Sequence, residues 1–357
     1  MPLKPLYYFL RPIIPRPLQL ILRRRLILRK RSLYSHIWPI DPAACAPPEE
    51  WIGWPEKKQF ALVLQHDVDT QRGHDKCRCL MDLEESCGFR SSFNFVPERY
   101  NVSESLRNEI TSRGFEVCVH GLKHDGKLFS SKRVFQKRAI SINRYLMEWN
   151  SLGFTSPSMH HNLDWMHELN IAYDTSTFDT DPFEPQPDSA RSIFPFLVYK
   201  RLDGSTASNA PGFNDFKHPS FYVELPYTLP QDHCIFIIMK EKTIDIWKQK
   251  LDWIAEKGGM ALLNTHPDYM NFVSRKFSFE EYPAQYYKGF LEYIKSKYYG
   301  QYWHALPSQI AHFWRENMVV ILTQRHKASK KNYLKTNILS PPKIGIDTLI
   351  SGLKVRF

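Results

Sequence analysis

The sequence of 357 residues is informative first for what it does not contain. Its six cysteines form no CxxC pairs of the zinc-ribbon type and no disulfide ladder, which favours a reducing compartment. No uninterrupted apolar stretch approaches the ~20 residues that a membrane-spanning helix needs, and we find no internal repeat or low-complexity tract. Because 43% of the residues are hydrophobic and 14% aromatic, the chain can bury a substantial core.

Acidic residues are missing from the first 40 positions, which carry nine Lys and Arg side chains among Leu, Ile and Tyr. Arg and Pro interrupt every apolar run there and no small-residue cleavage site follows, so we do not expect a secretory leader. This composition is typical of a helix in a membrane interface; the alternative is a solvated arm that packs on the body. We predict that residues 1–40 contact an anionic membrane surface, as a peripheral segment of a cytoplasmic protein.

The positive charge is confined to the two ends of the chain. Of the net +11, residues 1–40 contribute +9 and residues 325–357 contribute +7, which leaves −5 for the residues between them. We therefore predict a basic C-terminal tail at residues 316–357. An acidic middle without a nucleic-acid-reading module argues against nucleic acid as a partner. Nothing in the sequence indicates an oligomeric state.

The middle of the chain alternates strand-like and helix-like segments. Residues 41–57 are rich in Pro and aperiodic, and we predict a linker there. Apolar strand-like runs follow at residues 60–65, 91–96, 115–120, 233–238 and 260–265. Helix-like segments intervene at residues 77–88, 102–114, 131–153 and 242–259. This alternation over residues 58–315 predicts an α/β domain with a parallel sheet, either open or closed into a barrel.

Ionisable side chains follow three of the five predicted strands. Asp67 and Asp69 end the first, His120 and His124 follow the third, and His266 follows the last. Active-site residues of parallel α/β folds project from the carboxyl ends of strands, so these side chains are expected at one rim.

Two histidines four residues apart can reach one cation if the segment between them is a helical turn. A carboxylate from a neighbouring strand would complete a site of two histidines and one carboxylate, and Zn²⁺ in such a site lowers the pKa of a bound water to about 7. Because residues i and i+2 of a strand face the same way, one aspartate can bind metal while the other takes the proton of the water.

Each of these motifs has a simpler explanation when it is taken alone. Aspartates at strand ends often cap a following helix, and paired histidines are common on exposed helices. Together they favour a metal site, because one fold would bring all three strand ends to the same place.

Five stretches stand out by their order and spacing: "LQHDVDT", "VHGLKHDGK", "GFTSPSMHHN", "AYDTSTFDTDPFEPQP" and "ALLNTHPDYM". Together, over residues 58–315, they resemble the motifs of the polysaccharide deacetylase (NodB homology) superfamily, carbohydrate esterase family 4. They look closest to its Asp-x-Asp branch from bacterial surface-glycan gene clusters. The resemblance implies a distorted (β/α) barrel, usually of seven strands, with a divalent metal and a carbohydrate substrate. It also implies that Asp69, His120 and His124 bind the metal, that Asp67 is the general base and that His266 is the general acid.

The sequence departs from the family pattern at two places. Thr155 stands where the family commonly has the arginine that braces the base, and Arg191 is our candidate to replace that arginine. The aspartate that orients the acid histidine is not evident, with Asp174 and Asp179 as candidates. Loop turns or helix caps explain these residues equally well. We predict that the substrate contacts Pro157, His160, His161, Asp174 and Arg191.

The function that this pattern predicts is removal of an N-acetyl group from an amino sugar, in a surface polysaccharide or a lipid-linked glycan, by a metal-dependent hydrolase. Two alternatives use the same site. One is a deformylase or a cyclic-imide hydrolase, and the other is a non-catalytic relative that only binds glycan.

Overall fold

The computed structural model describes residues 15–49, 51–200, 221–273 and 277–317. Contacts between Cα atoms divide the chain into residues 1–315 and 316–357, and the description below concerns the first of these units. The predicted basic tail lies outside the described residues except for its first two positions. The boundaries predicted within the first unit, at residues 40/41 and 57/58, stay predictions.

A nine-stranded sheet forms the centre of the fold, and all of its neighbouring strands are parallel except β6 and β7. Its order is β11-β1-β2-β3-β4-β5-β7-β6, and β8 pairs with the other side of β1. The strands are β1 (Phe60–Val68), β2 (Ser92–Phe95), β3 (Glu116–His120), β4 (Gly153–Thr155), β5 (Tyr173–Asp174), β6 (Phe196–Tyr199), β7 (Phe221–Glu224), β8 (Met260–Thr265) and β11 (Tyr302–His304). A separate parallel pair consists of β9 (Met270–Asn271) and β10 (Tyr282–Pro283).

The strand β1 has three neighbours, β2 and β11 on one side and β8 on the other. All nine of its residues are buried, as expected for a parallel strand covered on both faces. The register sets Asp67 opposite Asn94 of β2 and Gln65 opposite Asn264 of β8. The carboxyl end of β1 is therefore surrounded by the ends of its neighbours.

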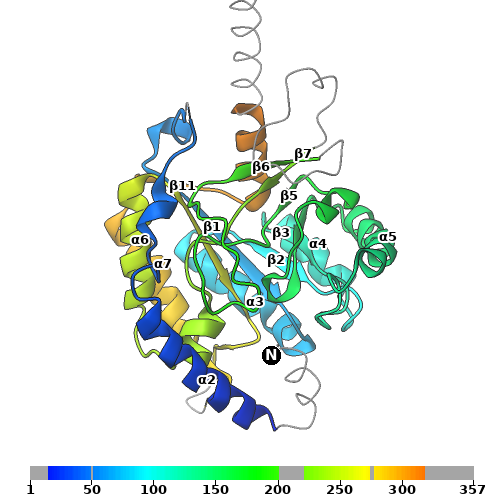
Figure 1. Cartoon of the computed structure of the whole chain (residues 1–357), viewed down its shortest axis with the longest axis horizontal. Coiled ribbons are helices and arrows are strands. Elements are labelled where there is room, and N and C mark those ends of the chain that lie inside the picture. The colour runs from blue at the N-terminus through cyan, green and yellow to red at the C-terminus, as the bar shows by residue number, and fades with distance from the viewer. Residues whose placement is uncertain (1–14, 50, 201–220, 274–276, 318–357) are drawn as a thin grey trace, which may run out of the picture. The chain divides into compact units, whose positions relative to one another are not determined.

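The sheet curls, and the segment that follows β7 returns to β8. After β7 the chain continues beside the core, where Tyr227 bridges Phe178 and Leu229 bridges Leu263, both in parallel. The amide of Thr228 also donates to the carbonyl of Leu262 at 3.0 Å. The predicted distorted (β/α) barrel is thereby confirmed, with a short irregular segment in place of one regular strand (Figure 1).

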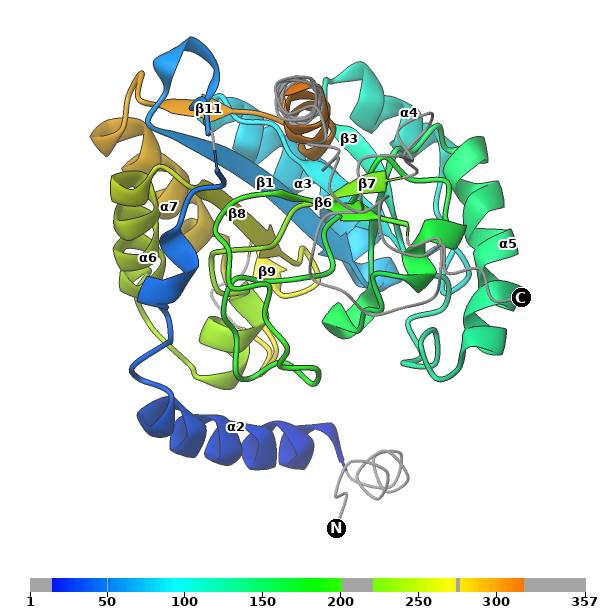
Figure 2. The same cartoon turned by 45° about the horizontal axis from the view of Figure 1, so that its top comes forward.

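Helices cover the sheet on its outer sides, with α6 and α7 on one flank and α4 and α5 on the other (Figure 1, Figure 2). The helix α3 ends at Gly88, whose φ of +85° forms a left-handed cap. The helices are α2 (Arg16–Leu33), α3 (Gln71–Cys87), α4 (Glu104–Ser112), α5 (Lys132–Glu148), α6 (Asp245–Lys257) and α7 (Ala284–Lys297). Residues 307–317 are also helical.

One short helical segment lies where the sequence analysis predicted a strand. Residues 233–238, predicted as a strand, form the π-helix η5 (His233–Ile238). A short apolar run fits a buried helix as well as a buried strand, and the Asp232 carboxylate favours the helix by accepting from the amide of His233 at 2.7 Å. The 3-10 helices are η1 (Pro42–Cys45), η2 (Pro55–Lys57), η3 (Pro157–Met159) and η4 (Trp165–Glu168).

The segment predicted as a linker packs against the barrel. Trp54 is buried and its indole N–H donates to the carbonyl of Gly258 at 2.8 Å. The ring of Trp51 lies 4.8 Å from that of Trp54 and 4.9 Å from that of Trp314. Trp51 and Trp54 thus pack this segment on the hydrophobic core.

Candidate active site

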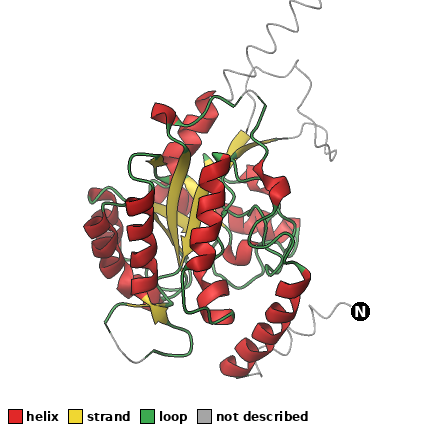
Figure 3. Cartoon of the chain, turned by 90° about the vertical axis from the view of Figure 1, so that its left-hand side faces the viewer, coloured by secondary structure: helices red, strands yellow, loops and turns green. Residues whose placement is uncertain are grey.

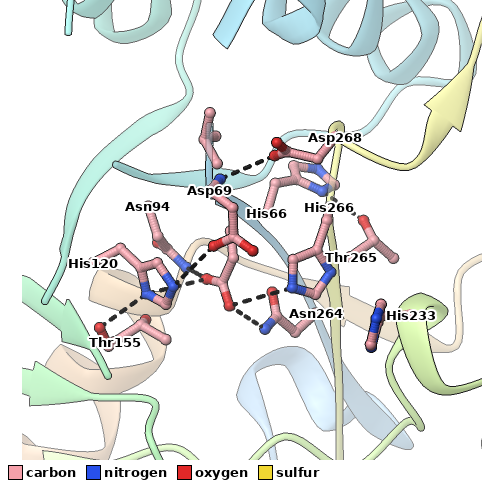
Figure 4. A network of polar contacts seen from close by, with 12 residues as sticks. His66, Asp69, Asn94, His120, Thr155, His233, Asn264, Thr265, His266 and Asp268 are labelled. Atoms are coloured by element: carbon pink, nitrogen blue, oxygen red, sulfur yellow. Dashed lines mark hydrogen bonds and ion pairs between the residues drawn. The ribbon is translucent and has the colours of Figure 1, made fainter. Parts of the chain in front are cut away.

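The carboxyl end of β1 carries two buried carboxylates, Asp67 within the strand and Asp69 directly after it. Side chains from β2, from β3, and from β8 and the residue after it converge on them, as Figure 4 shows for Asn94, His120, Asn264 and His266. All of these segments meet at one rim of the barrel. The structure therefore brings together the five side chains to which the sequence analysis assigned catalytic and metal-binding roles.

Asp69, His120 and His124 form a group whose potential ligand atoms all lie within 4.8 Å of one another. Oδ1 of Asp69 lies 3.4 Å from Nε2 of His120 and 3.0 Å from Nε2 of His124. This buried oxygen has no hydrogen-bond donor of acceptable geometry. Three electron-pair donors thus face one point, which fits a divalent cation of the kind that two imidazoles and a carboxylate bind.

The two histidines reach this point in a way the sequence analysis did not foresee. Residues 121–124 form no helical turn; instead His124 has a φ of +52° and Gly121 a φ of +60°. A Cβ at Gly121 would lie 2.6 Å from the ring of Pro157. The tight packing of Pro157 on Gly121 bends the loop, and the loop turns His124 back toward Asp69.

Hydrogen bonding fixes the orientation of His120. Its Nδ1 lies 3.0 Å from the carbonyl oxygen of Thr155 and donates its proton there, which leaves the lone pair of Nε2 directed at Asp69. Burial opposes charge on Asp69, but the neighbouring imidazoles of His124 and His120 hold the pKa of that carboxyl well below its usual value. The ligand group is therefore built to keep its carboxylate ionised.

The base candidate, Asp67, is held by two amides. Nδ2 of Asn94 donates to Oδ1 at 2.8 Å, and Nδ2 of Asn264 donates to Oδ2 at 2.7 Å. Both amides come from strands that flank β1, so the sheet register itself supplies them. Asn94 and Asn264 make the contacts for which we considered Arg191, which instead is exposed.

The acid candidate, His266, follows β8 and points at the same carboxylate. Its Nε2 lies 3.9 Å from Oδ2 of Asp67, and its Nδ1 donates to Oδ1 of Asp232 at 2.7 Å. Oδ2 of Asp232 accepts from the amide of His266 and from the hydroxyl of Tyr282, each at 2.9 Å. Burial alone would lower the pKa of His266, but the charge and hydrogen bond of Asp232, with the charges of Asp69 and Asp67, raise it to about 10.

Asp232 therefore takes the orienting position for which the sequence analysis considered Asp174 and Asp179. Asp179 is buried elsewhere, 2.5 Å from the ammonium of Lys250. Asp174 lies beside Glu224 in the β5–β7 register and accepts from the hydroxyl of Ser176 at 2.6 Å. Burial first, and then the Asp174 charge, raises the pKa of Glu224 well above its usual value.

A further aspartate ties the two halves of the site together. Oδ2 of Asp268, two residues after His266, accepts from the amide of Asp69 at 2.9 Å, and its other oxygen accepts from the Thr70 hydroxyl. A Cβ at Gly73 would lie 2.1 Å from the same carboxylate. The loop of the acid candidate is thus docked on the turn that presents Asp69, a candidate metal ligand.

His66 points away from the site, into a buried network behind β1. Its Nδ1 contacts the hydroxyl of Thr265 at 2.7 Å, and its Nε2 contacts Glu84 at 2.9 Å. Glu84 also accepts from the hydroxyls of Ser91 and Tyr287. This network fixes β1 against β8 and α3 and leaves Asp67 and Asp69 free for the rim.

The predicted substrate residues are divided between the rim and its surroundings. Pro157 and His160 line a small cavity together with His124. His161 is oriented away from it, with its Nδ1 2.9 Å from the carbonyl of Met159. Asp174 is completely buried and Arg191 is exposed without a contact to the site among the described residues. Only Pro157 and His160 therefore lie beside the group of Asp69, His120 and His124.

Three residues of the site were missed in the sequence analysis. Asn94 and Asn264 are amides within otherwise buried strands, and a polar residue in such a run is a usable signal because burial requires a partner. Asp232 follows "YTLPQ" and carried no such signal. Its contact with His266 depends on the bridge between Leu229 and Leu263, which no local pattern indicates.

No protein-family model matches the sequence, and no curated protein matches it significantly. Solved structures do match. A protein of Mycobacterium smegmatis assigned as a polysaccharide deacetylase gives a TM-score of 0.54 at 16% identity, over 76% of this chain and 96% of that one. The allantoinase PuuE gives 0.52 at 16% identity, over 78% and 98%. A protein of Pseudomonas aeruginosa PAO1 assigned as a polysaccharide deacetylase gives 0.51 at 16% identity, over 74% and 93%.

These likenesses concern the fold. The barrel of this chain is the one that structures of polysaccharide deacetylases and of an allantoinase share, and the resemblance inferred from the five motifs is confirmed at that level.

Proposed function

We propose that this protein is a metal-dependent hydrolase that removes an N-acetyl group from an amino sugar in a surface polysaccharide or a lipid-linked glycan. The observation that carries the proposal is the position of Asp67. It is held by two amides, faces Nε2 of His266 on one side and lies beside the Asp69, His120 and His124 group on the other.

Asp69, His120 and His124 would hold the divalent cation. Two imidazoles and one carboxylate favour Zn²⁺ and leave positions for water and substrate. A cation there would make a water acidic enough to lose its proton near neutral pH and would polarise the substrate carbonyl.

Asp67 accepts the proton of the attacking water. Its carboxylate is buried and both of its oxygens accept amide hydrogen bonds, so the strands fix its orientation before substrate arrives. The water oxygen then bonds to the carbonyl carbon of the N-acetyl group. General-base assistance of this kind contributes typically 10²–10⁴-fold to a rate.

His266 supplies the second proton. With its pKa raised to about 10 by Asp232 against the effect of burial, the imidazole is protonated at neutral pH. Its Nε2–H is directed into the site while Nδ1–H is committed to Asp232. When the C–N bond breaks, Nε2 gives its proton to the leaving nitrogen, and the products are acetate and a free amino sugar.

A carbohydrate substrate is supported by two of the matching structures described above, which are assigned as polysaccharide deacetylases. A small cavity whose lining includes His124, Pro157 and His160 lies next to the group of Asp69, His120 and His124. Opening of a cyclic amide is the second candidate, because the allantoinase PuuE has the same fold and the same acid and base would serve. Deformylation is a further variant of this chemistry. A protein that only binds glycan would have no use for Asp67 and His266 in this arrangement.

The test is product release by purified protein reloaded with Zn²⁺. N-acetyl, N-formyl and cyclic-amide substrates are compared, and we expect acetate from N-acetylated glycans. Asp67→Asn should keep the metal and lose turnover, whereas Asp75→Asn, which changes an exposed carboxylate on α3, should leave turnover unchanged. Full activity of the Asp67→Asn variant would remove the proposed base, and turnover of the cyclic amide alone would favour the second candidate.

A further inference from the structure

The helix α2 lies apart from the helices that cover the sheet, at the edge of the unit (Figure 2, Figure 3). Its inner side is fixed to the body. Leu20 and Ile27, two helical turns apart, are buried. Arg16 pairs with Glu280 at 2.8 Å, and Arg31 pairs with Glu241 at 2.5 Å. The helix is therefore anchored along its length rather than held as a free arm.

The outer side of α2 is apolar and basic. Its exposed apolar side chains have between 42 and 72% of their surface accessible; they are Leu18, Ile21, Leu22, Leu26, Leu28 and Leu33. Arg24, Arg25 and Arg29 are exposed between them. Residues 1–40 contain no Asp or Glu to offset this charge. Exposed apolar groups gathered on one surface generally mark an interaction site.

We propose that this outer face of α2 binds the surface of an anionic lipid bilayer. Leucines interleaved with arginines are what a helix lying in the headgroup region requires, since the leucines enter the acyl boundary and the arginines meet lipid phosphates. No helix in the described part of the chain is long and apolar enough to cross a membrane. The contact concerns the surface of the bilayer, and it does not depend on the proposed function.

A second copy of the chain fits this face less well. A two-fold contact places the same surface on both partners, so Arg24, Arg25 and Arg29 would meet their own counterparts. The face offers no carboxylate to neutralise them. Like charges brought together at an interface are unfavourable, whereas an anionic bilayer neutralises all three at once.

The inner side of α2, opposite the proposed membrane face, packs on a segment that begins beside the candidate active site. On its inner side α2 packs against η5, whose first residue, His233, has its ring 6.5 Å from that of His266. The helix is therefore connected to the candidate active site through η5.

The test is co-sedimentation of the full-length protein with vesicles of phosphatidylcholine alone or mixed with phosphatidylserine. We expect binding to the mixed vesicles only. The variant Arg24→Gln/Arg25→Gln/Arg29→Gln should bind roughly a hundredfold more weakly, about fivefold for each arginine. The variant Leu22→Ser/Leu26→Ser should lose more than tenfold, since two leucines no longer enter the acyl boundary.

Helix α5 offers matched controls on another flank of the unit (Figure 1). Lys132→Gln/Arg133→Gln/Lys137→Gln also removes three positive charges, here from exposed positions of α5. Ile140→Ser/Met147→Ser removes two apolar side chains that are 75 and 76% exposed. Both should bind like wild type.

Four results would overturn the proposal. The first is that the wild type does not bind anionic vesicles, and the second is that either α2 variant binds them as well as wild type does. The third is that the α5 variants lose as much binding as the α2 variants. The fourth is that light scattering finds a wild-type oligomer that Leu22→Ser/Leu26→Ser converts to monomer. Unfolding temperatures within the wild-type range for all four variants establish that the losses are local.

Discussion

The contact between Asp232 and His266 gives the most quantitative prediction, because one substitution separates charge from shape. Asp232→Asn keeps the size of the side chain and an oxygen that accepts from Nδ1 of His266. It removes the negative charge, which heads the causes that raise the pKa of this buried imidazole against its desolvation. The imidazolium is the form that donates a proton to the leaving nitrogen, so the variant should lose that form at lower pH.

The size of the effect follows from the raised pKa. Moving it from 6.5 to about 10 corresponds to about 5 kcal/mol of added stabilisation of the imidazolium, at ~1.4 kcal/mol for each pKa unit. Asp232 carries the largest share, and a bound cation would offset the charge of Asp69. We therefore expect Asp232→Asn to lower the pKa of His266 by about 2 pKa units or more.

The assay is the pH dependence of kcat/KM, which reports the free enzyme. The alkaline limb due to His266 should lie at least about 2 pH units lower in Asp232→Asn than in wild type. Asp232→Asn should also lower the free energy of unfolding, because it removes stabilisation of the imidazolium. Because the folded pKa is raised, His266 contributes fully to stability below its unfolded pKa of 6.5 and loses that contribution as pH rises through about 10. The variant should therefore be less stable at neutral pH.

Tyr282→Phe is the matched control. It removes a hydroxyl that donates to Asp232 at 2.9 Å but leaves the carboxylate charge in place. Its alkaline limb should stay closer to that of wild type than the limb of Asp232→Asn does. An Asp232→Asn limb at the wild-type pH, with activity otherwise intact, would refute His266 as the acid tuned by Asp232.

Three other predictions concern single side chains. Asn264→Ala should lower kcat/KM by about 10- to 150-fold, since it removes a hydrogen bond to a carboxylate worth about 1.5–3 kcal/mol, and unchanged kinetics would exclude the amide brace of Asp67. Asp69→Ala should abolish retention of Zn²⁺ in elemental analysis; stoichiometric metal in this variant would contradict the ligand set. Gly121→Ala should lower stability in thermal unfolding by more than ~2 kcal/mol, because it adds a steric clash to the ~1–2 kcal/mol of left-handed strain. Gly126→Ala, with a φ of +71° and open space around its Cβ, should show the strain alone, and equal losses in both would exclude the clash.

The parts of the fold that follow from local pattern were predictable from the sequence. Strands at 60–65, 115–120 and 260–265 could be recognised because each is an apolar run that ends in polar residues with chemistry of their own. The prediction of a strand at 233–238 was wrong because a buried π-helix and a buried strand can have the same apolar composition.

The hydrogen bonds within the candidate site were less predictable from the sequence than the residues that form the site. The proton on Nδ1 of His120 goes to the backbone oxygen of Thr155, a role that any residue at that position can fill. Asp232 reaches His266 through a bridge between segments more than thirty residues apart. Such contacts depend on the closed barrel as a whole, and periodicity within one segment carries no information about them.

The pairing of β1 with three other strands has a consequence for how such a protein changes over evolutionary time. Asp67, Asn94 and Asn264 sit on neighbouring strands, so their mutual distances are dictated by main-chain pairing. Surrounding loops can then be lengthened, shortened or exchanged for new ones while the candidate base and its two amides stay in place. A designer who wishes to give this scaffold a different substrate should replace the loops and leave the strands alone.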